Sequence, residues 1–270
     1  MEEQQAYLDI KRARRNLVLG LIAAIAAIDG AVFFTAGSEI EAIVSDISRV
    51  GTVCAAAALS LVVVRRQKVG GLFGRAYAAL AAGLMLWVVA ESIWAYYELG
   101  LGIGAHTTSI ADVFWISGYG PFAYHLLSTA RFFGKGLKRS AIAIVGVAAA
   151  LFLAFYIQTL VGVFELEGPG VLATLAISIV YPVLDALLIV PAVLIVMNAG
   201  KGQLTSIPWI FIGWILLVLA DSMLGVAAAS DMSEVFHITM AYNAAYLCFA
   251  AGLLWYNRQF IISDKKLVNW

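Results

Sequence analysis

Residues 17–36 read LVLGLIAAIAAIDGAVFFTA, and Asp29 is the one ionisable residue among these twenty. About 20 predominantly apolar residues in a helix cross the ~30 Å hydrocarbon core of a bilayer. Seven further stretches have this character, and 63% of all residues are hydrophobic against 13% charged. The composition excludes a soluble protein and predicts an all-α integral membrane protein with eight transmembrane helices. The expected spans are Leu17–Ala36, Ile43–Val64, Ala76–Leu99, Ala111–Phe133, Ser140–Val163, Val171–Asn198, Pro208–Ala229 and Val235–Tyr256.

Basic residues lie before the first span, after the last, and in every second connection between spans. They are Lys11, Arg12, Arg14, Arg15, Arg65, Arg66, Lys68, Arg75, Arg131, Lys135, Lys138, Arg139, Lys201, Arg258, Lys265 and Lys266. The other connections carry acids, with Arg49 as their basic exception. Because cytoplasmic loops are enriched in Lys and Arg, both termini are predicted to be cytoplasmic. We expect a cytoplasmic segment 1–16, a membrane domain 17–256 and a cytoplasmic tail 257–270, in the cell (plasma) membrane.

An internal repeat pairs the first four spans with the last four. Leu86–Ser92 (LWVVAES) resembles Leu217–Ser222 (LVLADS), and Asp112–Ser117 (DVFWIS) resembles Glu234–Thr239 (EVFHIT). Both matches occur in the same order and keep a carboxylate in place, although chance similarity between apolar helices is the alternative. Four spans return the chain to the same side, so the two halves would be parallel and related by an axis along the membrane normal. The expected repeats are residues 17–133 and 140–256.

Four acids inside the predicted spans are the main candidates for function: Asp29, Glu91, Asp185 and Asp221. An ionised carboxylate at the bilayer centre costs about 2.5–3.5 kcal/mol, so each should face the bundle, be paired or be protonated. The repeat matches Glu91 with Asp221, and their protonation would be coupled if they lie close together. Alternatively, each acid accepts a local hydrogen bond and merely fixes helix register. Candidate donors are Ser92, Ser222, Trp94, Tyr119 and Tyr242.

Arg49 is the basic residue on the otherwise acidic side. It lies three residues after Asp46 on one helical face, so one interpretation is a local ion pair at the membrane surface. The other has Arg49 leaning inward, as counter-ion to Glu91 or Asp221 or as the binding group for an anionic ligand.

The sixth span is irregular at Tyr181-Pro182-Val183-Leu184-Asp185. A proline inside a helix removes a backbone hydrogen bond. Beside a buried acid, this predicts either a cavity near Tyr181 and Asp185 or an ordinary kink of the bundle.

Several chemistries lack support in the sequence. His106, His125 and His237 are isolated from one another, so we expect neither a metal site nor a haem. Cys54 and Cys248 lie within spans, where a thiol is usually a packing residue. No phosphate loop or nucleophile elbow is present. We therefore predict no catalytic residue, no cofactor and no nucleic-acid partner.

Three segments resemble multi-span membrane input regions of bacterial and archaeal signalling proteins, which precede PAS, GGDEF or histidine-kinase domains. They are Ala111–Pro121 (ADVFWISGYGP), Ile179–Leu188 (IVYPVLDALL) and Leu219–Met223 (LADSM). The resemblance implies a sensor that passes a helix movement to a cytoplasmic output. Residues 257–270 are too few for such a domain, so we expect either a cytoplasmic partner or homo-oligomer that completes signalling, or a sequence that is a fragment of a longer protein.

The leading functional prediction is a non-enzymatic sensory or ligand-binding membrane module with an outward-facing polar site. The site residues are expected to be Glu91, Asp221, Arg49, Asp185, Tyr119, Tyr242, Tyr181 and Asp29. The alternatives are a small proton-coupled secondary transporter and a structural subunit of a membrane complex.

Overall fold

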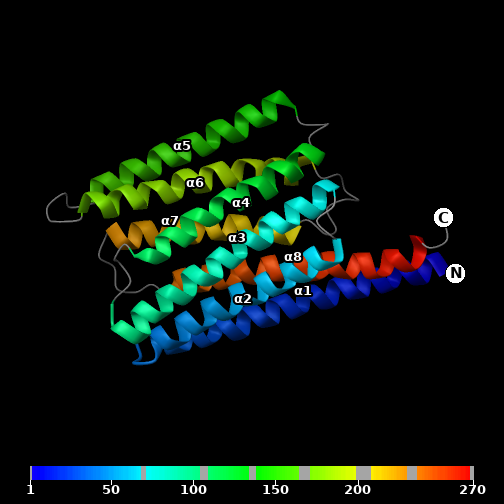
Figure 1. Cartoon of the computed structure of the whole chain (residues 1–270), viewed down its shortest axis with the longest axis horizontal. Helices are drawn as coiled ribbons and strands as arrows, with labels where there is room; N and C mark the ends of the chain where they lie inside the picture. The colour runs from blue at the N-terminus through cyan, green and yellow to red at the C-terminus, as the bar shows by residue number, and fades with distance from the viewer. Residues whose placement is uncertain are drawn as a thin grey trace.

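The computed structural model describes residues 2–67, 71–103, 109–133, 138–163, 171–198, 208–229 and 236–267, and every regular element in these ranges is a helix (Figure 1). This confirms the predicted all-α class. The helices are α1 (Glu2–Thr35), α2 (Glu41–Gln67), α3 (Gly71–Ala95), the π-helical turn η1 (Tyr96–Gly100), α4 (Ile110–Phe133), α5 (Arg139–Val163), α6 (Val171–Asn198), α7 (Pro208–Ala229) and α8 (Phe236–Leu267).

Seven of the described helices are long and apolar enough to cross a membrane, namely α1, α2, α3 with η1, α5, α6, α7 and α8. The chain is therefore a multi-pass membrane protein. The exception is α4, which has 24 residues but carries polar side chains such as Asp112, His125 and Thr129 along its length. An eighth span through α4 stays a prediction.

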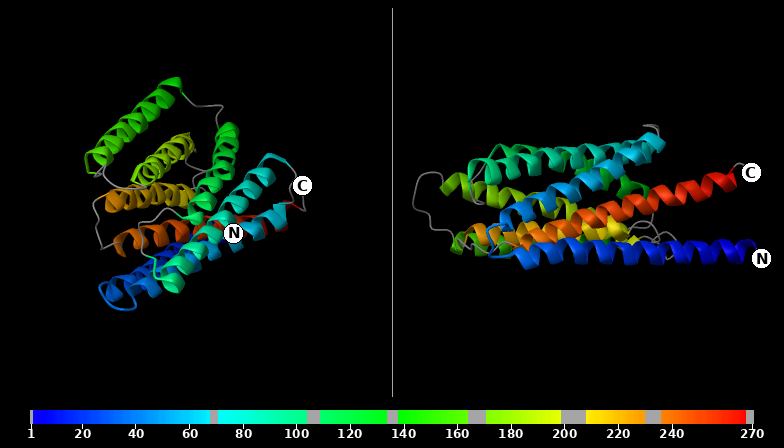
Figure 2. Two further views of the ribbon diagram at one scale, coloured as in Figure 1. Left: turned by 60° about the vertical axis from the view of Figure 1, so that its left-hand side comes forward. Right: turned by 90° about the horizontal axis from the view of Figure 1, so that it is seen from below.

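Two helices are longer than the sequence pattern indicates. α1 begins at Glu2 rather than near Leu17, and α8 continues to Leu267 rather than ending near Tyr256. Neither extension contains Gly or Pro, so nothing in the sequence stops the helix. The segments expected outside the membrane domain are thus largely continuations of α1 and α8. Figures 1 and 2 show both helices projecting in the same direction beyond the others. We call this the termini end of the bundle, and the opposite end the far end.

The helices pack side by side, with α8 near the centre and α5 at an edge (Figures 1 and 2). Among the described residues α5 packs on α6 and α7 alone, and α1 packs on α2 and α8 alone. The remaining neighbours are α2 with α3 and α8, α3 with α4, α4 with α6, α6 with α7, and α7 with α8. Six helices, α2, α3, α4, α6, α7 and α8, therefore form the interior where buried polar groups can meet.

A layer of aromatic side chains crosses this interior. Trp87 of α3 contacts Phe122 of α4 with ring centroids 5.0 Å apart, and Phe122 contacts Trp214 of α7 at 4.9 Å. Trp214 in turn contacts Phe249 of α8 at 4.9 Å. All four side chains are at most 2% exposed. We call these four residues the aromatic layer; it joins the two sequence halves through a contact between α4 and α7.

Glycines allow close helix contacts, and two of them precede Glu91 and Asp221 by eight residues. A Cβ atom at Gly83 of α3 would overlap the ring of Phe122 on α4. A Cβ atom at Gly213 of α7 would lie 3.0 Å from the carbonyl oxygen of Ala245 on α8. Small residues at such contacts let membrane helices approach each other closely.

Candidate functional site

Buried charged residues gather in two places on the far-end side of the aromatic layer. The first, which we call the arginine cluster, consists of Asp46, Arg49, Glu91 and Glu98. Arg49 of α2 donates a hydrogen bond to Asp46. Its Nε lies 3.9 Å from Oε2 of Glu91, and its Nη2 lies 4.0 Å from Oε2 of Glu98. Arg49 is 13% exposed, against 1% for Asp46 and 3% for Glu91, so three carboxylates surround one largely buried guanidinium.

Local helix geometry assembles this cluster. Asp46 and Arg49 share one face of α2 because they are three residues apart. Glu91 and Glu98 are seven residues apart on α3 and η1, which also places them on one face. The π-helical turn η1 widens the end of α3, a feature often found at functional sites. In addition, Trp94 Nε1 donates to Oε2 of Glu98 at 3.1 Å.

Three buried atoms of the arginine cluster have no hydrogen-bond partner among the described residues. They are Oδ2 of Asp46, Nε of Arg49 and Oε2 of Glu91. A buried donor or acceptor costs free energy unless it is matched. A ligand that accepts from Nε and donates to the carboxylates would satisfy all three atoms. The arrangement is therefore chemically suited to bind a small polar ligand.

The second place is what we call the aspartate pair, Asp185 of α6 and Asp221 of α7, whose carboxyl groups both lie within hydrogen-bond distance of one hydroxyl. The hydroxyl of Tyr119 on α4 lies 2.8 Å from Oδ1 of Asp185 and 3.1 Å from Oδ2 of Asp221. Tyr242 of α8 donates to Oδ1 of Asp221. Four helices thus converge on one pair of acids.

The carboxyl group that shares the Tyr119 hydroxyl with Asp221 is that of Asp185, whereas the repeat had directed attention to Glu91. α6 packs on both α4 and α7, which carries Asp185 between Tyr119 and Asp221. Glu91 instead accepts a hydrogen bond of 2.8 Å from Tyr246 of α8.

Two stacked tyrosines connect the arginine cluster with the aspartate pair. Tyr242 and Tyr246 lie one helical turn apart on α8, with ring centroids 6.3 Å apart. Tyr242 bonds to Asp221 and Tyr246 bonds to Glu91. The position of α8 is therefore tied to both acids that the repeat had matched.

Other predicted site residues lie elsewhere. Tyr181 donates to Oδ1 of Asp112 at 2.7 Å, and its ring lies 6.3 Å from that of Tyr119. Asp112 Oδ2 accepts from the backbone N–H of Ser109 at the start of α4, and Glu234 lies outside the described residues. Asp29 is buried on α1 and belongs to neither cluster.

Two of the hydroxyl groups that were expected to donate to the acids, those of Ser92 and Ser222, donate instead within their own helices. Ser92 donates to the carbonyl of Val88, and Ser222 donates to that of Val218. The other predicted donors behave differently, since Tyr119 and Tyr242 reach an acid of another helix.

Glu98 and Tyr246 were missed by sequence reasoning. Glu98 was assigned to a connection on the acidic side, although its spacing of seven from Glu91 places both on one helix face. Tyr246 follows Tyr242 by four residues, which is the available signal for a shared face.

Beyond the aromatic layer, toward the termini end, His125, Thr129 and Ser60 are satisfied locally, whereas Nε1 of Trp255 has no partner among the described residues. His125 Nδ1 lies 3.0 Å from the carbonyl oxygen of Ala76. Thr129 donates to the carbonyl of His125, and Ser60 donates to that of Ala57. In the described part of the chain these contacts form no hydrogen-bonded chain to the acids. Nor do the described residues hold a group of three or more His, Cys, Asp or Glu side chains suited to a metal ion.

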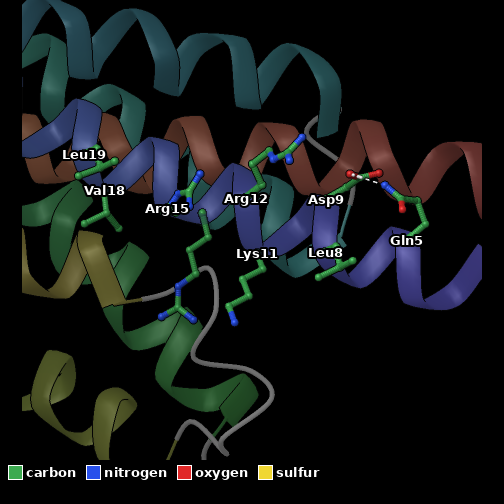
Figure 3. Close-up of a pocket in the computed structure, with 9 residues that line it drawn as sticks. Gln5, Leu8, Asp9, Lys11, Arg12, Arg15, Val18 and Leu19 are labelled. Carbon is green, nitrogen blue, oxygen red and sulfur yellow. Dashed lines mark hydrogen bonds between the residues drawn. The ribbon is translucent and has the colours of Figure 1, made fainter.

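A separate pocket lies along α1 near the termini end (Figure 3). It is lined by Gln5, Leu8, Asp9, Lys11, Arg12, Arg14, Arg15, Val18 and Leu19. Figure 3 shows Lys11 and Arg12 pointing to different sides of α1. This pocket is basic and exposed, unlike the two buried clusters.

Comparison of the chain with protein-family models, with curated proteins and with solved structures finds no match. The function must therefore be inferred from the geometry of the site.

Proposed function

We propose that this chain is a non-enzymatic sensory or ligand-binding module of the cell membrane, with eight spans, cytoplasmic termini and an outward-facing polar site. The arginine cluster carries this proposal. It combines an unpartnered buried donor with unpartnered buried acceptors, near the end of the bundle that faces away from both termini. A ligand arriving from outside would complete these hydrogen bonds and alter the balance of charge around Arg49.

The positions of the termini support the topology. Both lie at one end of the bundle, which an even number of spans requires (Figure 1). Basic residues of the described ranges such as Arg12, Arg65 and Arg131 map to that end, as expected for the cytoplasmic side, and Arg49 is the exception. The resemblance to signalling input regions agrees with this orientation and suggests a cytoplasmic partner or a homo-oligomer as the recipient of the signal.

Helix contacts support the proposed duplication. The repeat pairs α1 to α4 with α5 to α8 in order. Under this exchange the α3–α4 contact corresponds to α7–α8, α2–α3 to α6–α7, and α2–α8 to α6–α4, and all of these contacts occur. The sequence match also extends back to Gly83 and Gly213, each eight residues before its acid and each pressed against the following helix. The α1–α8 contact has no such counterpart between α5 and α4 among the described residues, so the peripheral helices depart from the symmetry.

α8 is the best candidate for the element that transmits a signal. Tyr242 and Tyr246 bind it to the acids, and Asn243 donates to Ser48 on α2 at 2.9 Å. The same helix then continues unbroken to Leu267 at the termini end. A change of charge at Glu91 would therefore bear directly on a helix that reaches the other side of the membrane.

A proton-coupled transporter is the second candidate, and the aspartate pair favours it. Transport requires a path to both sides, however, and the aromatic layer lies between the acids and the termini end. The locally satisfied groups beyond that layer give no continuation. Sensing or binding therefore fits the described interior better than transport does.

The test measures α8 against α1 in nanodiscs with paired spin labels. Leu19→Cys and Leu254→Cys place the labels on exposed positions of the two helices, in a chain whose Cys54 and Cys248 are replaced by Ala. We expect Glu91→Gln to shift the distance distribution, because it removes the negative charge beside Arg49 that helps to fix Tyr246.

A matched control is Asp112→Asn, which neutralises an acid that contacts a tyrosine of α6 rather than of α8. It should leave the distances unchanged. An unchanged distribution in the Glu91 variant, together with proton flux through reconstituted protein, would favour the transporter and refute the sensory proposal.

A further inference from the structure

The structure points to a second binding site, distinct from the arginine cluster, whose ligand is a proton: we infer that Asp185 and Asp221 hold one proton between their carboxyl groups. The inference does not depend on the sensory proposal. It rests on the hydrogen atoms available around Tyr119 and on the surroundings of the two acids.

The hydroxyl of Tyr119 has one hydrogen but two acidic neighbours. Its oxygen lies 2.8 Å from Oδ1 of Asp185 and 3.1 Å from Oδ2 of Asp221, both within hydrogen-bond distance. A phenol can donate once and can also accept. If both acids were ionised, one of the two close oxygen–oxygen contacts would have no hydrogen and would be repulsive. One additional proton on the pair supplies the missing hydrogen.

The rest of the environment makes two negative charges costly. Neither acid makes an ion pair with a basic residue in the described ranges. Asp185 is 1% exposed, and its Oδ2 has no partner among the described residues. Two carboxylates that share such a site cannot both ionise readily. The carboxylate that remains can be Asp221, since it accepts the hydroxyl of Tyr242 as well.

The groups that face the pair supply no compensating cation. They are Glu91 from α3, Tyr119 from α4, Tyr156 from α5, Tyr181 from α6, and Tyr242 and Tyr246 from α8. Every one is an acid or a phenol. A proton taken from water converts one carboxylate into a carboxylic acid without any other change in composition, and its release restores the carboxylate.

Infrared spectroscopy tests this assignment on the purified full chain in nanodiscs at neutral pH. The spectrum of Asp185→Asn/Asp221→Asn is subtracted from that of the unaltered chain, in H₂O and in D₂O. We expect the difference to contain one protonated carboxyl band that shifts in D₂O, together with the bands of one carboxylate. Asp112→Asn, which alters another tyrosine-bonded aspartate, should leave that protonated band in place.

Carboxylate bands alone would show that both acids are ionised and would overturn the inference. Loss of two protonated carboxyls without any carboxylate band would equally overturn the shared single proton. If the double variant does not fold, the unaltered chain labelled with ¹³C at aspartate carboxyls decides. An isotope-shifted protonated carboxyl band that persists when the buried Asp29 is replaced by Asn supports the site, and the absence of such a band refutes it.

Neither result depends on ligand binding at the arginine cluster. The proton site can therefore fail while the sensory proposal holds, or hold while the sensory proposal fails.

Discussion

Removing Arg49 should be among the most destabilising single substitutions in this chain. At about 4 Å, one guanidinium–carboxylate attraction amounts to roughly 4 kcal/mol at an effective dielectric constant of about 20. Arg49 has three carboxylate neighbours, and Asp46 and Glu91 are almost completely buried. Leaving buried carboxylates without their counter-ion typically costs ~3–5 kcal/mol. We expect Arg49→Gln to lower the free energy of unfolding by that amount.

The measurement is denaturation in detergent, followed by tryptophan fluorescence. Arg14→Gln is the control, since Arg14 is exposed on α1 and its loss should change stability by at most about 0.5 kcal/mol. Adding Asp46→Asn to Arg49→Gln should restore about 1–3 kcal/mol, because one uncompensated charge then disappears. A loss below about 1 kcal/mol in the single variant, as for exposed pairs, would refute the buried-cluster reasoning.

Two further predictions concern packing and hydrogen bonding. Gly213→Ala should cost ~1–3 kcal/mol, because its Cβ would lie 3.0 Å from the carbonyl oxygen of Ala245, whereas Gly20→Ala, with open space around it, should be neutral in the same unfolding assay. Tyr246→Phe should cost ~1.5–3 kcal/mol by removing the 2.8 Å bond to Glu91, and an unchanged unfolding midpoint would show that this bond is dispensable.

Hydropathy and charge indicated the helical class and the multi-pass character, because the cost of exposing backbone and charge to lipid acts on every residue of a span. They did not predict the continuations of α1 and α8. A charged helix beyond the bilayer has no apolar signature, and only the absence of Gly and Pro marks it. Hydropathy is also a poor guide to α4. Its polar residues face neighbouring helices and lower its mean hydropathy.

The sequence predicted the individual residues of the candidate site better than it predicted which of them contact each other. The cost of burying carboxylates singled out Glu91, Asp185 and Asp221, and the repeat drew attention to two of them. The repeat could not reveal that Asp185 faces Asp221, because that contact depends on α6 packing against both α4 and α7. Helix-to-helix neighbours are a property of the assembled bundle, and local sequence spacing does not encode them.

The most direct test of the account concerns α4, the helix whose hydropathy leaves its span undecided. Single cysteines are introduced at Gly102, which precedes α4, and at Gly136, which follows α4 and lies outside the described residues. The protein, from which Cys54 and Cys248 have been removed, is reacted in sealed vesicles with an impermeant maleimide. The eight-span topology predicts labelling of the two positions from opposite sides, with Gly102 accessible from outside. Labelling of both positions from the same side would contradict the eight-span topology, and with it the outward-facing site.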